Sequence, residues 1–285
     1  MPKRMHLAVI GVIVGMVLVV TALVYRNQNS KLAQAALDGK LEEVERLLTE
    51  GVDVNGKAAT GLTALMAASN RGHIEVVRRL IAAGADANIA SDTGGTALMD
   101  ASWNGQLGVV KLLLENGADV NARDKSGATA LLLAALQGRT EVVNALIESR
   151  ADLEAGDNDG KTPLMAASLE GLTEIVRLLL EKGANPNASE KEGFTALMHA
   201  SVKGRLEAAR LLLQKGADVN ARENSGGTAL MLAAHEGQLE MVKLLLEKGA
   251  DATIQEKTGK TALSIASSRG QENVVRMLKE SKPSQ

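Results

Sequence analysis

Two patterns of apolar residues divide the chain. The first is a continuous run from Leu7 to Tyr25, 19 residues without a charged side chain. At 1.5 Å per residue, an α-helix of this length is about 28 Å long, close to the thickness of the hydrocarbon core of a bilayer. From about residue 30 onward, apolar residues instead recur in short clusters at helical spacing, separated by glycines and polar residues. The pattern predicts one membrane-spanning helix followed by an array of short amphipathic helices.

The uncharged run has two interpretations. The apolar part of a cleaved signal peptide is usually about 7 to 15 residues long and is followed by small residues at the cleavage site. Val20-Thr21-Ala22 resembles such a site, but it lies inside the run rather than after it. We therefore favour an uncleaved signal anchor over residues 7–25. Cleavage, with release of the rest of the chain, is the alternative.

The flanks of the run bear on its topology. Residues 1–6 form a short basic tail, and residues 26–29 form a linker. Because a short basic tail usually stays in the cytoplasm, we expect the rest of the chain to be extracytoplasmic, in a periplasm or a lumen. Gly11 and Gly15 form a G-x-x-x-G pair that would allow weak self-association of two such helices.

Beyond the linker the sequence repeats every 33 residues. In one unit, two short helical patterns are separated by Gly105 and closed by Gly117, and Lys111 and Glu115 face away from the apolar side of the second pattern. That apolar side comprises Val109, Val110, Leu113 and Leu114. The register is marked by Thr63, Thr96, Thr129, Thr162, Thr195, Thr228 and Thr261, and by Gly72, Gly105, Gly138, Gly171, Gly204, Gly237 and Gly270.

These motifs resemble the ankyrin-repeat family. The string T-A-L-M-x-A, as at Thr96, stands where that family usually carries T-P-L-H-x-A, and GADVNA at Gly117–Ala122 and Gly216–Ala221 matches its loop signature. The resemblance implies an all-α solenoid of helix-turn-helix units with projecting β-turn fingers and a concave face that binds another protein. Only Thr162-Pro163-Leu164 keeps the proline, and methionine usually replaces the histidine.

The ends of the array differ from its middle. Glu43 stands where other repeats place an apolar residue, and Lys279 takes the position that Leu114, Leu180 and Leu246 fill. A polar outer face closes a stack of repeats against water. We therefore expect an N-terminal capping repeat over residues 30–60, six full repeats over 61–258 and a C-terminal capping repeat over 259–285.

Arg150 marks an irregular repeat, because it replaces the glycine that closes the second helix elsewhere. A residue other than glycine costs about 1 kcal/mol in the left-handed conformation that such a position requires. We expect the repeat over residues 127–159 to exchange its amide hydrogens faster than its neighbours. The alternative is that the helix ends differently at Arg150.

Composition narrows the function. The chain has no cysteine, and no serine, histidine and carboxylate set converges, so catalysis is a remote alternative and neither a cofactor nor a metal is expected. Its net charge is −2, and because Lys3, Arg4 and Arg26 lie at the N-terminus, the remainder carries 29 basic and 34 acidic residues, a net charge of −5. That balance gives no electrostatic reason to bind nucleic acid.

Trp103 is the only tryptophan of the chain. The resemblance implies that the two residues before the inter-helix glycine point toward the concave groove. We expect an apolar ridge there, in which tryptophan is a typical binding hot spot. The alternative is that these side chains fill gaps between helices. The ridge comprises Trp103, Leu136, Leu169 and Val202, followed by His235; its rim comprises Asn104, Gln137, Glu170, Lys203 and Glu236. Selectivity is assigned to the finger residues Lys125, Asn158, Lys191, Phe194 and Asn224.

The sequence therefore predicts a membrane-tethered module that binds another protein on its concave face. Few residues separate Tyr25 from the first repeat, so the array would begin beside the bilayer, and the partner is expected to be membrane-bound or membrane-proximal. The alternative is a soluble secreted or periplasmic ankyrin-repeat binding protein, released by signal cleavage.

Overall fold

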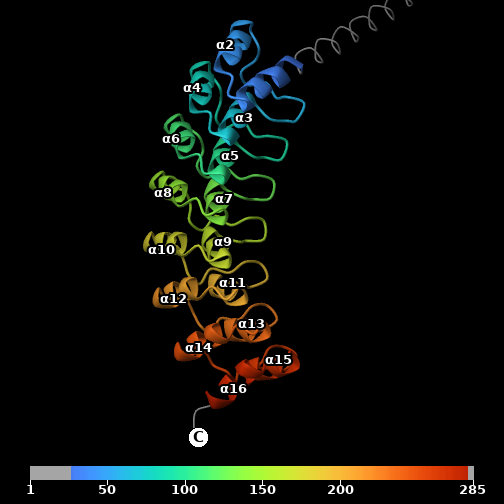
Figure 1. Ribbon diagram of the computed structural model, residues 1–285, viewed down its shortest axis with the longest axis vertical. Coiled ribbons are helices and arrows are strands. Elements are labelled where there is room, and N and C mark those ends of the chain that lie inside the picture. The colour runs from blue at the N-terminus through green and yellow to red at the C-terminus, as the bar shows by residue number, and fades with distance from the viewer. Residues whose placement is uncertain (1–26, 282–285) are drawn as a thin grey trace, which may run out of the picture. The chain divides into compact units, whose positions relative to one another are not determined.

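A computed structural model describes residues 27–281 as pairs of short helices joined by tight turns (Figure 1). The chain divides into two compact units, the first ending at Lys125 and the second beginning at Ser126. Among the described residues, the only strand-like pairing is an isolated antiparallel bridge between Ser189 and Thr195. The expected all-helical repeat architecture is confirmed within each unit.

In the first unit, helices lie in two rows, with α3 against α5 in one and α2, α4 and α6 in the other. We call the first helix of each pair, next to the turn that precedes the repeated threonine, the inner helix, and its partner the outer helix. That preceding turn is the finger turn. The helices are 27–37, α2 (Leu41–Thr49), α3 (Ala64–Arg71), α4 (Ile74–Ala82), α5 (Ala97–Asn104) and α6 (Leu107–Glu115).

The second unit repeats this arrangement five times. Each inner helix contacts the next inner helix and its own outer helix. The inner helices are α7 (Ala130–Leu136), α9 (Pro163–Glu170), α11 (Ala196–Val202), α13 (Ala229–His235) and α15 (Ala262–Ser268). The outer helices are α8 (Thr140–Glu148), α10 (Thr173–Glu181), α12 (Leu206–Gln214), α14 (Leu239–Glu247) and α16 (Glu272–Glu280).

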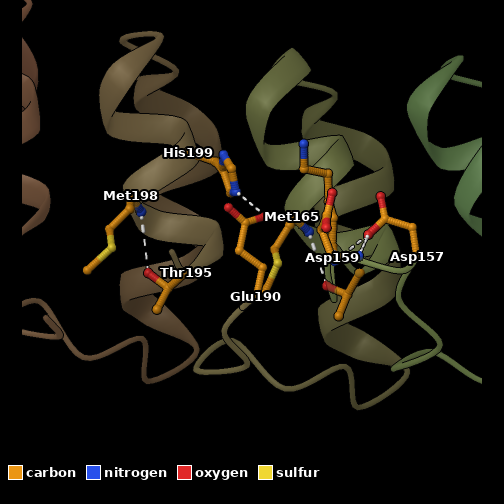
Figure 2. A network of polar contacts seen from close by, with 9 residues as sticks. Asp157, Asp159, Met165, Glu190, Thr195, Met198 and His199 are labelled. Atoms are coloured by element: carbon orange, nitrogen blue, oxygen red, sulfur yellow. Dashed lines mark hydrogen bonds and ion pairs between the residues drawn. The ribbon is translucent and has the colours of Figure 1, made fainter. Parts of the chain in front are cut away.

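The repeated threonine starts every inner helix from α3 to α15. The Thr96 hydroxyl accepts a hydrogen bond from the backbone N–H of Met99 at 3.4 Å, and Thr162 does the same for Met165 at 3.4 Å (Figure 2). A threonine in extended conformation satisfies one of the unpaired amides at a helix N-terminus, so its recurrence has a local physical cause. This cap fixes where each inner helix begins.

From α2 to α14, each outer helix is followed closely by a residue with positive φ. Gly183 takes φ 96°, whereas Arg150 takes φ 66° at the same repeat position and is the one described non-glycine residue with positive φ. The N–H of Arg150 donates to the carbonyl of Ile147 at 2.9 Å, just as that of Gly183 donates to Leu180 at 3.2 Å. The expected left-handed conformation of Arg150 is therefore confirmed, and the alternative helix ending is wrong.

The buried face of the outer helices follows the predicted pattern with one correction. In α6, Val109, Val110 and Leu113 are buried as expected, but Leu112 is buried with them while Leu114 is half-buried. Positions 112 and 114 lie about 100° to either side of Leu113 on a helix, so periodicity alone does not decide which of the two turns inward.

No helix among residues 27–281 is both long enough and apolar enough to cross a membrane. The predicted span over residues 7–25, including Gly11 and Gly15, lies outside the described residues and stays a prediction.

Candidate functional site

Trp103 lies on the surface of the first unit. Its side chain is 40% exposed on α5, and among the described residues only Leu62, 36% exposed, is a comparably exposed large apolar residue. The neighbouring Asn104 is half-buried, and its side-chain amide donates to the Asp100 carbonyl at 2.9 Å. Trp103 is therefore not enclosed in the core, and its predicted role in binding remains open.

The second unit holds the other members of the predicted ridge. Leu136, Leu169 and Val202 are all half-buried on inner helices. Leu136 also packs against a buried cluster of Ala128, Leu132 and Ala166, so part of its surface serves the interior of this unit. The continuity of these residues with Trp103 stays a prediction.

The predicted rim is more exposed than the ridge. Glu170, Lys203 and Glu236 are exposed and Gln137 is half-buried. His235 is already engaged, because its Nδ1 lies 2.8 Å from Oε1 of Glu236 and its Nε2 contacts the guanidinium of Arg269. The rim thus offers both signs of charge, with His235 held between two of its neighbours.

Backbone hydrogen bonds hold successive finger turns together. The N–H of Lys191 donates to the Asp159 carbonyl at 2.8 Å, and that of Asn224 donates to Glu192 at 2.9 Å. The side chain of Asn224 also donates to the Lys191 carbonyl at 2.8 Å, so it serves the structure as well. The predicted finger residues Lys125, Asn158, Lys191 and Asn224 are exposed, and Phe194 is half-buried.

The sequence reasoning missed a buried polar pair between a finger turn and an inner helix. His199 on α11 has its Nε2 3.4 Å from Oε2 of Glu190, and both side chains are almost wholly buried (Figure 2). The ring of Phe194 packs against the imidazole in a tilted arrangement, with its centroid 5.7 Å from that of His199. Burial lowers the pKa of His199, the Glu190 carboxylate opposes that shift, and Lys161 adds to it. His199 is therefore held largely neutral at pH 7.

The side chain of Glu190 differs from its equivalents in neighbouring repeats. Asp157 accepts from the N–H groups of Asp159 and Lys161, each at 2.9 Å, within its own turn (Figure 2). Glu223 likewise accepts from the N–H of Ser225 at 2.7 Å. Glu190 leaves its turn and reaches His199 instead, so this pair joins two elements where other repeats stabilise only one.

A second missed residue is Asp100, which occupies in α5 the position of His199 in α11. Burial raises the pKa of its carboxyl to about 6. Within residues 27–281 its carboxylate makes no hydrogen bond and no ion pair. The detectable signal was positional, because the other inner helices that begin with the repeated threonine carry alanine, leucine or isoleucine there, apart from His199.

No metal site is built in the described part of the chain, where no group of three histidine, aspartate or glutamate side chains is suitably placed. A depression of 510 Å³ is lined by residues of the last two repeats, Asp251, Thr253 and Leu278 among them, and none of the predicted binding residues lines it. The inner helices and finger turns therefore remain the candidate surface.

Comparison with known families gives a specific result. A family described as ankyrin repeats (3 copies) matches residues 32–124, 121–190 and 220–285, and a second, described as ankyrin repeats (many copies), matches residues 179–230. Together the matches extend over most of the described chain. A search of the curated proteins found no match.

Proposed function

Because this chain belongs to the ankyrin-repeat family, we propose that its inner helices and finger turns form a surface that recognises a specific partner protein. Ankyrin repeats are in general non-enzymatic interaction modules, and their extended faces suit protein partners. The finer proposal is that recognition centres on Trp103 and that the chain is tethered to a membrane by residues 7–25.

The exposure of Trp103 carries this proposal. Because the indole is 40% exposed, it contributes much less to folding than a fully buried indole would. The inner helices of other repeats fold without tryptophan, phenylalanine or tyrosine at this position. Tryptophan is enriched among binding hot spots, where a partner supplies the missing burial. A face with Trp103 and Leu62 both exposed supports docking of an apolar partner segment.

Site-specific crosslinking tests this surface. Trp103 is replaced by the photoreactive residue benzoylphenylalanine in the full-length chain, in cells that produce it, and Lys111 on the outer helix α6 serves as the matched control. We expect one dominant crosslinked protein from position 103 and none from position 111. Equal crosslinking from both positions, or none from 103, would contradict the proposed surface.

The tether accounts for a partner at the membrane. The proposed span ends at Tyr25 and the first described helix begins at residue 27, so the repeats would start beside the bilayer. Alkaline extraction of membranes, followed by N-terminal sequencing of the protein, separates the anchored form from the released one. An anchored chain stays in the pellet with its N-terminus intact, whereas a soluble chain that begins after residue 22 would establish cleavage.

A further inference from the structure

An unpaired carboxylate lies beside the exposed tryptophan. Asp100 and Trp103 are three residues apart on α5, which places their side chains on the same face of the helix with their Cβ atoms about 5 to 6 Å apart. Asp100 is half-buried, and nothing among the described residues pairs with its carboxylate. A negative charge thus lies beside the exposed indole on α5.

The second exposed apolar residue lies in the preceding repeat. In the second unit, Lys161 acts electrostatically on His199 of the next repeat. Leu62 and Asp100 occupy those two positions in the first unit, each 99 residues earlier, and their inner helices α3 and α5 are in contact. By this equivalence Leu62 lies on the side of Asp100 that faces the preceding repeat.

The chemistry of this surface decides which kind of ligand can bind there. A purely apolar segment would remove the remaining water from the carboxylate and leave its charge uncompensated, which is costly. A metal ion needs several oxygen or nitrogen ligands, and the described residues supply no such cluster. A lysine or arginine side chain fits, because its aliphatic stem packs on apolar groups, its charge pairs with a carboxylate, and it is attracted to the face of an indole.

We propose that Asp100, Trp103 and Leu62 form a subsite for one basic side chain of the partner. The Asp100 carboxylate accepts hydrogen bonds from the ammonium or guanidinium group, while the indole and Leu62 enclose the aliphatic stem. This subsite rests on the proposed function, since it specifies what the binding surface recognises.

The retained charge supports this assignment. Burial raises the pKa of Asp100 to about 6, so at pH 7 the folded chain carries a charge that its surroundings disfavour. Groups that are poorly satisfied inside a protein but aimed at its surface often mark functional sites. A bound cation would satisfy this carboxylate without any rearrangement of α5.

The test selects ligands without a known partner. A displayed library of random dodecapeptides is panned on the full-length chain in detergent micelles, and the selected peptides are synthesised. Their affinities are measured by the fluorescence of Trp103, which as the only tryptophan reports on the subsite itself. The variant Asp100→Asn removes the charge, and Glu115→Gln removes one charge from the exposed surface of α6 as the matched control.

We expect the selected peptides to share a lysine or arginine. Their affinity should fall about tenfold or more for Asp100→Asn, and equally when arginine is replaced by uncharged citrulline, while Glu115→Gln changes it little. Peptides that depend on Trp103 but carry no basic residue, or that ignore Asp100→Asn, would overturn the subsite and leave the proposed function standing. If no selected peptide perturbs Trp103, both proposals fail. Circular dichroism of Asp100→Asn verifies that the variant is folded.

Discussion

The helices α5 and α11 carry ionisable residues at the same repeat position, but only the residue on α11 has an oppositely charged side chain beside it. His199 on α11 is buried beside Glu190, a carboxylate from its own finger turn. Asp100 on α5 has no such partner among the described residues, and Trp103, one turn further along, is exposed where Val202 of α11 is half-buried. The comparison teaches that the fold can place an oppositely charged group beside an ionisable residue at this position. Where it does not, a partner is expected to do so.

The largest expected effect comes from breaking the buried pair of His199 and Glu190. His199→Leu introduces the residue that two other inner helices carry at this position, but it leaves the Glu190 carboxylate buried without a partner. Loss of one member of a buried pair typically costs about 3 kcal/mol, and we expect a decrease of that order in the free energy of unfolding. Urea denaturation measures it. The double variant with Glu190→Gln should recover much of the loss, and a neutral His199→Leu would show that the pair is unimportant.

Asp100→Asn should raise the free energy of unfolding, whereas His199→Leu lowers it. The folded-state pKa is raised from 3.8 to about 6, so the folded chain binds a proton more readily than the unfolded chain, and stability falls as pH rises between those two values. Removing the charge should stabilise the chain by up to about 3 kcal/mol at pH 8, with the gain vanishing below about pH 4. Thermal unfolding at both pH values measures this. A loss of stability at pH 8 would mean that Asp100 has an internal partner.

Acid should sharpen the contrast between the two helices. The pKa of His199 is lowered by burial, so its neutral form is favoured in the folded state, and the stability this provides is lost as pH falls below its usual 6.5. Asp100 instead favours folding as pH falls through about 6. Hydrogen exchange, corrected for intrinsic rates, should therefore show protection decreasing in α11 and increasing in α5 between pH 7.5 and pH 5. Parallel changes in both helices would contradict this difference.

The smallest effect concerns Arg150. It holds a left-handed conformation that glycine adopts without strain. Glu154, in the same repeat, occupies the position of Asn187 in the next one, and Asn187 makes two hydrogen bonds to the following loop, donating to Gly216 and accepting from Asp218. The Glu154 side chain makes only one hydrogen bond to the following loop, accepting from the N–H of Asn185 at 2.8 Å. Arg150→Gly should stabilise the chain by roughly 0.5 to 1 kcal/mol and slow amide exchange over residues 127–159. The matched change Gly183→Arg should destabilise it. Equal exchange along the second unit of the unaltered chain would remove the premise.

Much of the fold could be predicted from the sequence because the residues that begin and end the helices lie within each repeat. Thr96, for example, caps the N-terminus of α5. The 33-residue spacing places Gly117 and Arg150 at the same repeat position, where both have positive φ. The His199–Glu190 pair was not accessible in the same way, since glutamates at positions 190, 223 and 256 look alike. Hydrogen bonds from Ser225 and Thr258 hold Glu223 and Glu256 within their own turns, whereas Glu190 turns toward His199.

The candidate site was predicted only in part. Exposure of Trp103 followed from an interior built of small side chains, but the packing of Leu136 against Ala128 and Leu132 depends on distances that spacing does not give. Asp100 was missed although α11, with His199, is the only other helix begun by the repeated threonine that carries a polar residue at this position.

One measurement tests the central claim, that the inner face around Trp103 is kept for a partner and not for the core. Trp103→Ala is compared with the unaltered full-length chain for both thermal unfolding and affinity, toward the protein crosslinked at position 103 or a selected peptide that perturbs Trp103. We predict an affinity loss of about 2 kcal/mol or more, roughly thirtyfold, with little change in the unfolding midpoint. Unchanged affinity together with much earlier unfolding would show that Trp103 belongs to the core and would contradict the account.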